Sequence, residues 1–170
     1  MLFPLSRWAA GLATATLLSA IAQAADIVPS DVAPSTDDTT VLTLLHDGNR
    51  SELSRAQLER LPLYDTELQH FEGLNGRFTG IRLTRFIEAY GIDEARRLRF
   101  IAADDYTVFL TPSDVRAKDY LLVTRFEGEP LPRTNLGPLM LVVPEDAEAV
   151  RSGSTSMTNW IWAVVELRAQ

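Results

Sequence analysis

The order of hydrophobic and polar positions predicts mainly short strands, most clearly in the second half of the chain. From residue 98 onward, short runs of aliphatic, aromatic and β-branched residues are separated by turn residues such as Gly, Pro and Asp. Two earlier segments have the same character. Strands are therefore predicted at residues 41–45, 63–71, 98–102, 106–110, 120–126, 139–143 and 159–167.

One segment has a clear helical period. Leu83, Phe86, Ile87 and Tyr90 are spaced i, i+3, i+4 and i+7, and Gly91 follows where a helix commonly ends in a left-handed conformation. We expect this helix to bury its apolar stripe in the core.

Two shorter helices are indicated by their first residues. Residues 54–57, Ser-Arg-Ala-Gln, have the form of a capping box, and this helix should end at Pro62. Residues 111–114, Thr-Pro-Ser-Asp, are typical of a helix start, whereas residues 127–130, Glu-Gly-Glu-Pro, predict a turn after a buried strand. Together these elements indicate an α+β fold in which helices partly cover a single mixed sheet.

The first 24 residues have the features of an export signal. Arg7 is their only charged residue, an uncharged and mostly apolar run covers residues 9–22, and Ala-Gln-Ala at 22–24 is a small-x-small cleavage pattern. We predict a signal peptide cleaved before Ala25 and a periplasmic location. The alternative, an uncleaved membrane anchor, needs about 20 apolar residues, and this run is shorter and contains Gly and Thr.

The rest of the chain fits one domain. Residues 25–40 are rich in Pro, Ser, Thr and Asp, a composition that buries little apolar area, so we predict a flexible lead-in there. Residues 41–170 suffice for a full hydrophobic core and form the predicted domain.

Charge and residue usage narrow the classes of function. The formal net charge of −7 argues against nucleic acid and against an anionic membrane as partners. The sequence contains no cysteine and only two histidines, His46 and His70, which we interpret as ordinary surface or strand residues. Without a thiolate a structural zinc site is not expected, and no metal ligands are predicted.

The middle of the chain contains the first segment that resembles a known family. Residues 78–86, Phe-Thr-Gly-Ile-Arg-Leu-Thr-Arg-Phe, with Tyr-Gly-Ile at 90–92, are similar to W-x-G-V-P-L-x-x-L-L…A-G-I in the molybdopterin-binding domain of the sulfite oxidase family. Residues 103–108, Ala-Asp-Asp-Tyr-Thr-Val, lie where that family has a D-G-Y strand.

Three further segments follow in the family's order. Residues 121–131 resemble L-L-A-x-x-x-N-G-E-P-L, and residues 135–144 resemble H-G-x-P-L-R-L-V-V-P. Residues 159–164, Asn-Trp-Ile-Trp-Ala-Val, are similar to the R-W-V-W-Q-L ending of small stand-alone members. The resemblance extends over residues 63–168, and it implies the α+β fold of that family, a molybdopterin-binding-like domain.

The resemblance also says which chemistry to expect. The redox enzymes of the family hold molybdenum through a cysteine in the loop before the W-x-G-V-P-L segment, because the metal needs a thiolate there. The corresponding residues 65–77 offer Thr66, His70, Asn75 and Arg77 but no sulfur. The resemblance therefore implies a pocket for an organic pterin as ligand, with no molybdenum and no tightly bound cofactor.

The candidate wall of this pocket is aromatic. Trp160 and Trp162, at i and i+2 of a predicted strand, would point to the same face and present a flat apolar surface to a ring. The alternative is that both side chains only fill the core.

The segment before these tryptophans is rich in hydroxyl and amide groups. Ser156, Thr158 and Asn159 are its candidate ligand-binding residues, because such groups can surround a heterocycle with donors and acceptors. A mobile surface loop is the alternative. The family has a lysine where this chain has Asn159 or Ile161, which suggests a ligand without a phosphate.

Three other residues are candidates for polar contacts. Arg77 and Arg125 are the cations best suited to an anionic ligand edge, although Arg125 fits a surface ion pair equally well. Asn135 stands where the family has a histidine, and its amide can hydrogen-bond a ring.

The D-G-Y-like segment supplies the remaining candidates. Asp104 and Asp105 could accept hydrogen bonds from the amino-pyrimidine edge of a pterin, or could be turn residues between two strands. We favour the turn for Asp104 and therefore select Asp105, together with Tyr106, as ligand-binding.

The resulting hypothesis is a non-enzymatic periplasmic module that binds a pterin. Small exported proteins of this kind resemble periplasmic pterin-binding regulators, which pass the signal to the periplasmic domain of a membrane-bound enzyme of cyclic diguanylate turnover. Two alternatives remain: a molybdopterin-dependent oxidoreductase with a non-cysteine ligand, and a protein adaptor that kept the fold with a vestigial pocket.

Overall fold

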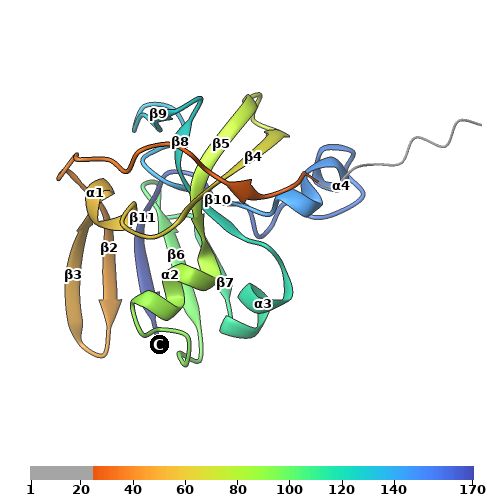
Figure 1. Ribbon diagram of the computed structural model, residues 1–170. Helices are drawn as coiled ribbons and strands as arrows, with labels where there is room; N and C mark the ends of the chain where they lie inside the picture. Colours follow the sequence, from red (N-terminus) through yellow and green to blue (C-terminus); the bar gives the residue numbers. More distant parts are fainter. Residues whose placement is uncertain (1–24) are drawn as a thin grey trace, which may run out of the picture.

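A computed structural model describes residues 25–170, so the predicted signal peptide and its cleavage site lie outside the described residues. The chain forms one α+β domain, as predicted, but its strands divide between two sheets where a single mixed sheet was expected (Figure 1). Within residues 25–170, no helix has the length and apolar character needed to cross a membrane.

The first sheet has six strands, all joined to their neighbours in antiparallel fashion. Its main path runs β1-β4-β5-β8-β10, and β9 pairs with β8. The bounds are β1 Val28–Pro29, β4 Leu63–Gln69, β5 Asn75–Arg82, β8 Leu121–Phe126, β9 Glu129–Pro130 and β10 Met140–Val142.

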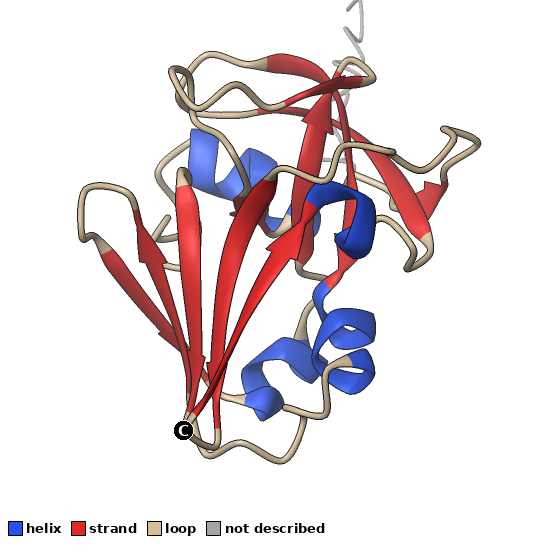
Figure 2. Ribbon diagram, turned by 90° about the vertical axis from the view of Figure 1, so that its left-hand side faces the viewer, coloured by secondary structure: helices blue, strands red, loops and turns tan. Residues whose placement is uncertain are grey.

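The second sheet has five strands in the order β3-β2-β11-β6-β7 and is mixed, because β11 runs parallel to β2 and antiparallel to β6. Helices α2 and α3 lie on one side of it (Figure 2). The bounds are β3 Asn49–Ser54, β2 Thr40–His46, β11 Val164–Ala169, β6 Leu98–Ala102 and β7 Thr107–Leu110.

The short helices follow local signals in the sequence. Ser54 and Gln57 form a reciprocal capping box at the start of α1 (Arg55–Leu58), and Thr111 and Asp114 form another at the start of α3 (Pro112–Ala117). Helix α2 (Leu83–Ala89) buries the predicted stripe. A 3-10 turn (Pro144–Asp146) and α4 (Ala147–Arg151) were not predicted.

Strands β5 and β8 approach each other closely at one glycine. A Cβ built on Gly80 would lie 2.3 Å from the carbonyl oxygen of Leu122 and 2.7 Å from the Cα of Val123. Only a residue without a side chain fits at this position, which lies within a bulge of the β5–β8 ladder.

Strands β1, β3, β5 and β9 were not predicted from the sequence, and the start of β11 was misplaced. Strand β3 follows the predicted turn, and β5 begins within residues predicted as a loop. The prediction of a strand from residue 159 was wrong, because β11 starts at Val164. Ala163 before it has a left-handed φ of 52°, and only an isolated bridge joins Ile161 to Leu141, so residues 159–163 are irregular.

The flexible lead-in predicted for residues 25–40 is instead bound along the domain. Val28 and Pro29 pair with β4, and the Ser30 amide donates to the Leu63 carbonyl at 2.9 Å. Further on, the Ala56 amide donates to the Asp37 carbonyl at 3.0 Å. Backbone pairing holds this polar segment although it buries few apolar side chains.

Candidate functional site

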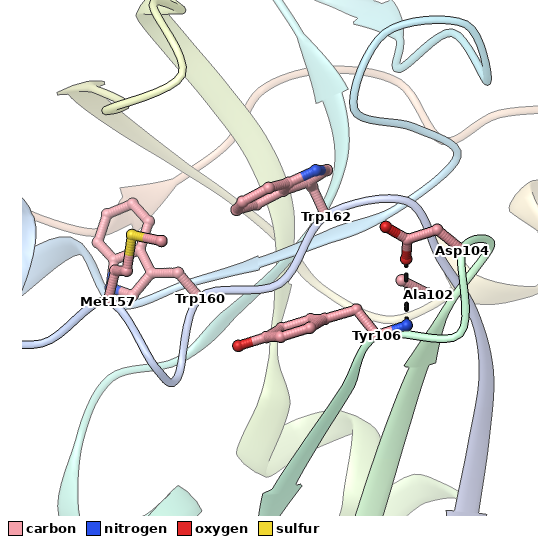
Figure 3. A pocket seen from close by; sticks show the side chains of 6 residues that line it. All are labelled: Ala102, Asp104, Tyr106, Met157, Trp160 and Trp162. Atoms are coloured by element: carbon pink, nitrogen blue, oxygen red, sulfur yellow. Dashed lines mark hydrogen bonds between the residues drawn. The ribbon is translucent and has the colours of Figure 1, made fainter.

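A small, mainly apolar pocket lies where the β6–β7 hairpin faces the irregular segment that leads into β11 (Figure 3). Its volume is about 170 Å³. That is comparable to the roughly 150 Å³ cavity that accommodates one benzene ring, and smaller than the ~300–1,000 Å³ of pockets for drug-sized ligands. The lining residues are Ala102, Asp104, Tyr106, Met157, Trp160 and Trp162.

Two aromatic rings face each other across this pocket. Both residues line the pocket, and Figure 3 shows the indole of Trp162 on one side of it and the phenol ring of Tyr106 on the other. Trp162 is partly buried, whereas Tyr106 is 50% exposed. We call this space the aromatic slot; its two flat walls suit a planar ring, which stacks on aromatic faces.

Trp160 closes one end of the slot together with Met157. It is only 2% exposed, and its indole nitrogen Nε1 is buried without a hydrogen-bond partner.

A cluster of rings from the end of β4 supports both tryptophans. The ring of His70 lies 5.3 Å from that of Trp160 and 6.1 Å from that of Trp162, and it stacks on Phe71 at 4.4 Å. Phe71 in turn lies 5.6 Å from Trp162 at a steep angle. These contacts hold the pocket wall in place from behind.

The sequence suggested that His70 is an ordinary surface or strand histidine, but the structure places it in this aromatic cluster. It is 2% exposed, and burial lowers its pKa to about 4, so the ring is neutral near pH 7. The Glu72 amide donates to Nδ1 at 3.2 Å, which leaves the hydrogen of the neutral ring on Nε2. Its position within residues 65–77, where the family has its cysteine loop, pointed to the site. Nothing in the sequence spacing linked it to the tryptophans.

The two aspartates of the β6–β7 hairpin have different surroundings. Asp105 was predicted to bind the ligand, but Asp104 is the one that lines the pocket. Asp104 lines the aromatic slot, and its Oδ1 accepts the Tyr106 amide at 3.1 Å. Asp105 has a left-handed φ of 68° and lines a separate hollow with Arg99 and Arg168. Asp104 is thus both a turn residue and a pocket residue, whereas Asp105 is outside the pocket.

The hydroxyl-rich loop lies beside the slot, and only Met157 of its residues lines it. Ser156 and Thr158 are exposed and hydrogen-bond each other. Asn159 donates to the hydroxyl of Tyr120 at 3.0 Å, and burial raises the pKa of that phenol to about 12. The role of Asn159 in this structure is to fix the loop before Trp160.

Two other predicted site residues lie away from the slot. Arg77 lines a different hollow with Asp65 and Thr66, and Asn135 is exposed in the loop between β9 and β10. Of the nine predicted ligand-binding residues, the pocket therefore brings together three: Tyr106, Trp160 and Trp162.

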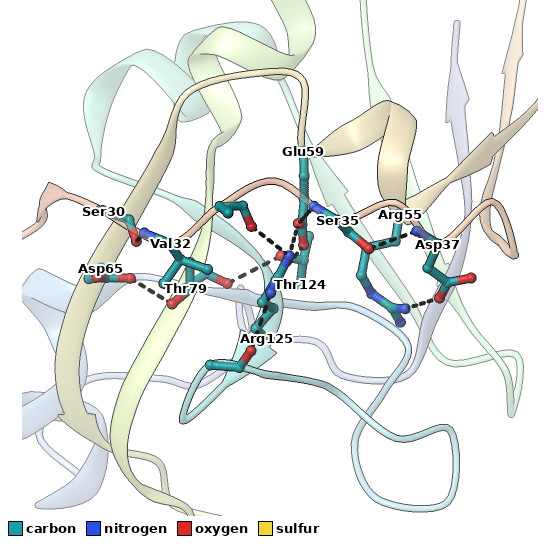
Figure 4. A network of polar contacts seen from close by, with 12 residues as sticks. Ser30, Val32, Ser35, Asp37, Arg55, Glu59, Asp65, Thr79, Thr124 and Arg125 are labelled. Atoms are coloured by element: carbon teal, nitrogen blue, oxygen red, sulfur yellow. Dashed lines mark hydrogen bonds and ion pairs between the residues drawn. The ribbon is translucent and has the colours of Figure 1, made fainter.

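Arg125 forms a buried ion pair with Glu59 (Figure 4). Its guanidinium also donates to the Ala33 carbonyl at 3.1 Å, and the Ser35 amide donates to Glu59 at 2.7 Å. Burial alone would raise the pKa of Glu59, but its hydrogen bonds, chiefly those from Arg125, outweigh this and lower the pKa. Arg125 thus binds the lead-in to the domain and is not available to a ligand.

The donor set does not fit a molybdenum centre of the sulfite oxidase type. That centre takes a cysteine thiolate as ligand, and the sequence contains no cysteine. Within residues 25–170 no three His, Asp or Glu side chains gather as a metal site, and His70 is surrounded by aromatic rings.

A search of the curated proteins returns no significant match. The family described as the oxidoreductase molybdopterin binding domain matches residues 30–153. This range includes Asp104 and Tyr106 and ends before Met157, Trp160 and Trp162, so one end and one wall of the slot lie outside it. The fold and the match over most of the chain establish that this protein belongs to the oxidoreductase molybdopterin-binding domain family, of the sulfite oxidase type.

Proposed function

We propose that this chain is an exported, non-enzymatic module that binds a pterin in the aromatic slot. Occupancy of the slot would be relayed to the periplasmic domain of a membrane-bound enzyme of cyclic diguanylate turnover. The family binds a pterin-type molecule, and the observation that carries the proposal is an open slot between Trp162 and Tyr106 in a member that has no cysteine.

The slot matches a pterin in shape and polarity. A pterin is planar, with apolar faces and a polar edge, so the two rings would stack on its faces. Asp104, one of the lining residues, offers an acceptor for its edge. The site has no cationic side chain among its lining residues, which favours a free pterin over one that carries a phosphate.

The absence of a thiolate supports a binding role over redox catalysis. The enzymes of this type use the cysteine to hold the metal that exchanges electrons. The residues at the corresponding place in this chain pack as an aromatic support for the slot, with His70 and Phe71 against the tryptophans. The chain would thus keep the pocket, while the segment that carries the metal-binding cysteine in the enzymes serves here to pack against the tryptophans.

Side chains at the pocket mouth support a relay to a partner. Tyr106 and Met157 are among the large hydrophobic side chains that stay exposed, at 50% and 48%, and both line the slot. A ligand that enters the slot would contact them directly and change what this surface presents. Exposed apolar groups of this kind are typical of interaction sites.

Binding is tested by fluorescence titration with pterin against three proteins: wild type, Trp162→Ala and Phe109→Ala. Phe109 is a matched control, because it is exposed to a similar degree as Tyr106 but does not line the slot. We expect saturable binding by wild type and Phe109→Ala, and at least tenfold weaker binding by Trp162→Ala. Absence of binding to any oxidised or reduced pterin would refute the proposal.

The competing function is a molybdenum oxidoreductase with a ligand other than cysteine. Elemental analysis of protein produced in a molybdenum-replete periplasm distinguishes the two. Our proposal predicts far less than one molybdenum per chain, and a stoichiometric amount would favour the enzyme.

A further inference from the structure

The aromatic slot has unlike ends. Figure 3 shows the Asp104 carboxylate at one end and Trp160 with Met157 at the other, with Trp162 and Tyr106 as the walls between them. A planar ligand between the walls would therefore present one edge to a carboxylate and the opposite edge to an indole. Such a site can distinguish the two edges of a ring system.

The carboxylate has acceptor capacity left for a ligand. Oδ1 of Asp104 accepts one hydrogen bond, from the Tyr106 amide at 3.1 Å. No other hydrogen bond or ion pair reaches Asp104 from any of the residues 25–170, although an ionised carboxylate offers about four acceptor positions. The same hydrogen bond fixes the carboxylate relative to Tyr106, one wall of the slot.

A carboxylate fixed in this way selects a particular kind of edge. Two adjacent, parallel N–H donors form paired charge-assisted hydrogen bonds with its two oxygens, as a guanidinium does. A ring edge that instead presents a carbonyl oxygen beside its N–H would place an acceptor against the negative charge. The slot is thus complementary to a heterocycle with an amino group next to a ring N–H.

We propose that Asp104 is the specificity-determining residue of the slot and that it selects 2-amino-4-oxo heterocycles over their 2,4-dioxo counterparts. This inference rests on the proposed function and adds the ligand subclass and its orientation. The 2-amino group and the adjacent N3–H point to Asp104, and the opposite side of the ring system points to Trp160.

The test compares pterin with lumazine, which have the same bicyclic frame but differ at position 2, amino against oxo. Isothermal titration is done at a pH at which both compounds are neutral. We expect wild type to bind pterin about 10- to 100-fold more tightly, the range for hydrogen bonds to a charged group. Asp104→Asn should bring the ratio to within about threefold of one, because an amide neither attracts two donors as strongly nor repels a carbonyl.

The neighbouring aspartate supplies the control. Asp105→Asn removes the same charge one residue away, in the separate hollow, and should leave the ratio unchanged. The variant at position 104 should fold, since an asparagine Oδ1 can still accept the Tyr106 amide, and circular dichroism checks this.

Each outcome decides a different claim. Equal affinities of wild type for pterin and lumazine would overturn the inference and leave pterin binding intact. An unchanged ratio in Asp104→Asn, or the same loss in Asp105→Asn, would also overturn it. Binding of neither compound would refute the proposed function itself.

Discussion

Replacing Arg125 by alanine removes the partner of a fully buried carboxylate. The side chain of Glu59 is 0% exposed and that of Arg125 is 12% exposed, so the pair is largely shielded from water. Removing one partner of a buried ion pair costs about 3–5 kcal/mol, because the remaining charge is left without compensation. The substitution also removes the hydrogen bonds to the carbonyls of Ala33 and Gly128, at 3.1 and 3.3 Å.

For a chain of this size, 1 kcal/mol corresponds to roughly 2–4 °C in melting temperature, so Arg125→Ala should lower it by about 6–20 °C. Differential scanning calorimetry at neutral pH measures the shift. Glu59→Gln in the Arg125→Ala background should recover part of it, because an amide is cheaper to bury than a charge. A loss below 2 °C, or no recovery in the double variant, would refute the claim that this buried ion pair attaches the lead-in to the domain.

The pH dependence of this pair has a definite sign. The folded-state pKa of Glu59 is lowered from its ordinary 4.5, so its contribution is present above that pH and is lost as the pH falls through the lowered value. The Arg125→Ala protein should therefore be closer to wild type in stability at low pH than at neutral pH. Unfolding by urea at several pH values measures the difference.

Three further predictions concern the packing behind and beside the slot. Burial lowers the pKa of His70 from 6.5 to about 4, so the free energy of unfolding should fall by about 3 kcal/mol as the pH falls from about 6.5 to 4. His70→Phe should remove this pH dependence, as measured by urea unfolding. Gly80→Ala should destabilise by about 1–3 kcal/mol through overpacking against Leu122, and a change below 0.5 kcal/mol would contradict the close approach. Asn159→Ala should weaken pterin binding severalfold with about 1 kcal/mol of lost stability, and Tyr120→Phe, which removes the same hydrogen bond, should match it.

Local signals in the sequence were enough to predict α1, α2 and α3, but not α4 or the 3-10 turn before it. The capping boxes at Ser54 and Thr111 involve residues three apart, and the stripe of α2 lies within two turns, so a short window contains the whole cause. The lead-in was harder. This segment is held by hydrogen bonds to partners such as Leu63 and Glu59, tens of residues away, and its own composition gives no indication of these partners.

The site could be predicted only in part, for a similar reason. Trp160 and Trp162 both line the pocket, but the strand from which their shared face was argued starts at Val164 and not at Asn159. Asp105 was selected where Asp104 lines the slot, because the left-handed turn at Asp105 decides which of these two exposed carboxylates lies beside the pocket. His70 meets the tryptophans through ring contacts between distant parts of the chain, for which the sequence has no local signal.

A crystal structure of the protein with pterin tests the central claim most directly. The account predicts the pterin ring between the faces of Trp162 and Tyr106, with its 2-amino edge toward Asp104. A pterin bound elsewhere, with the slot empty or filled by protein side chains, would contradict the account.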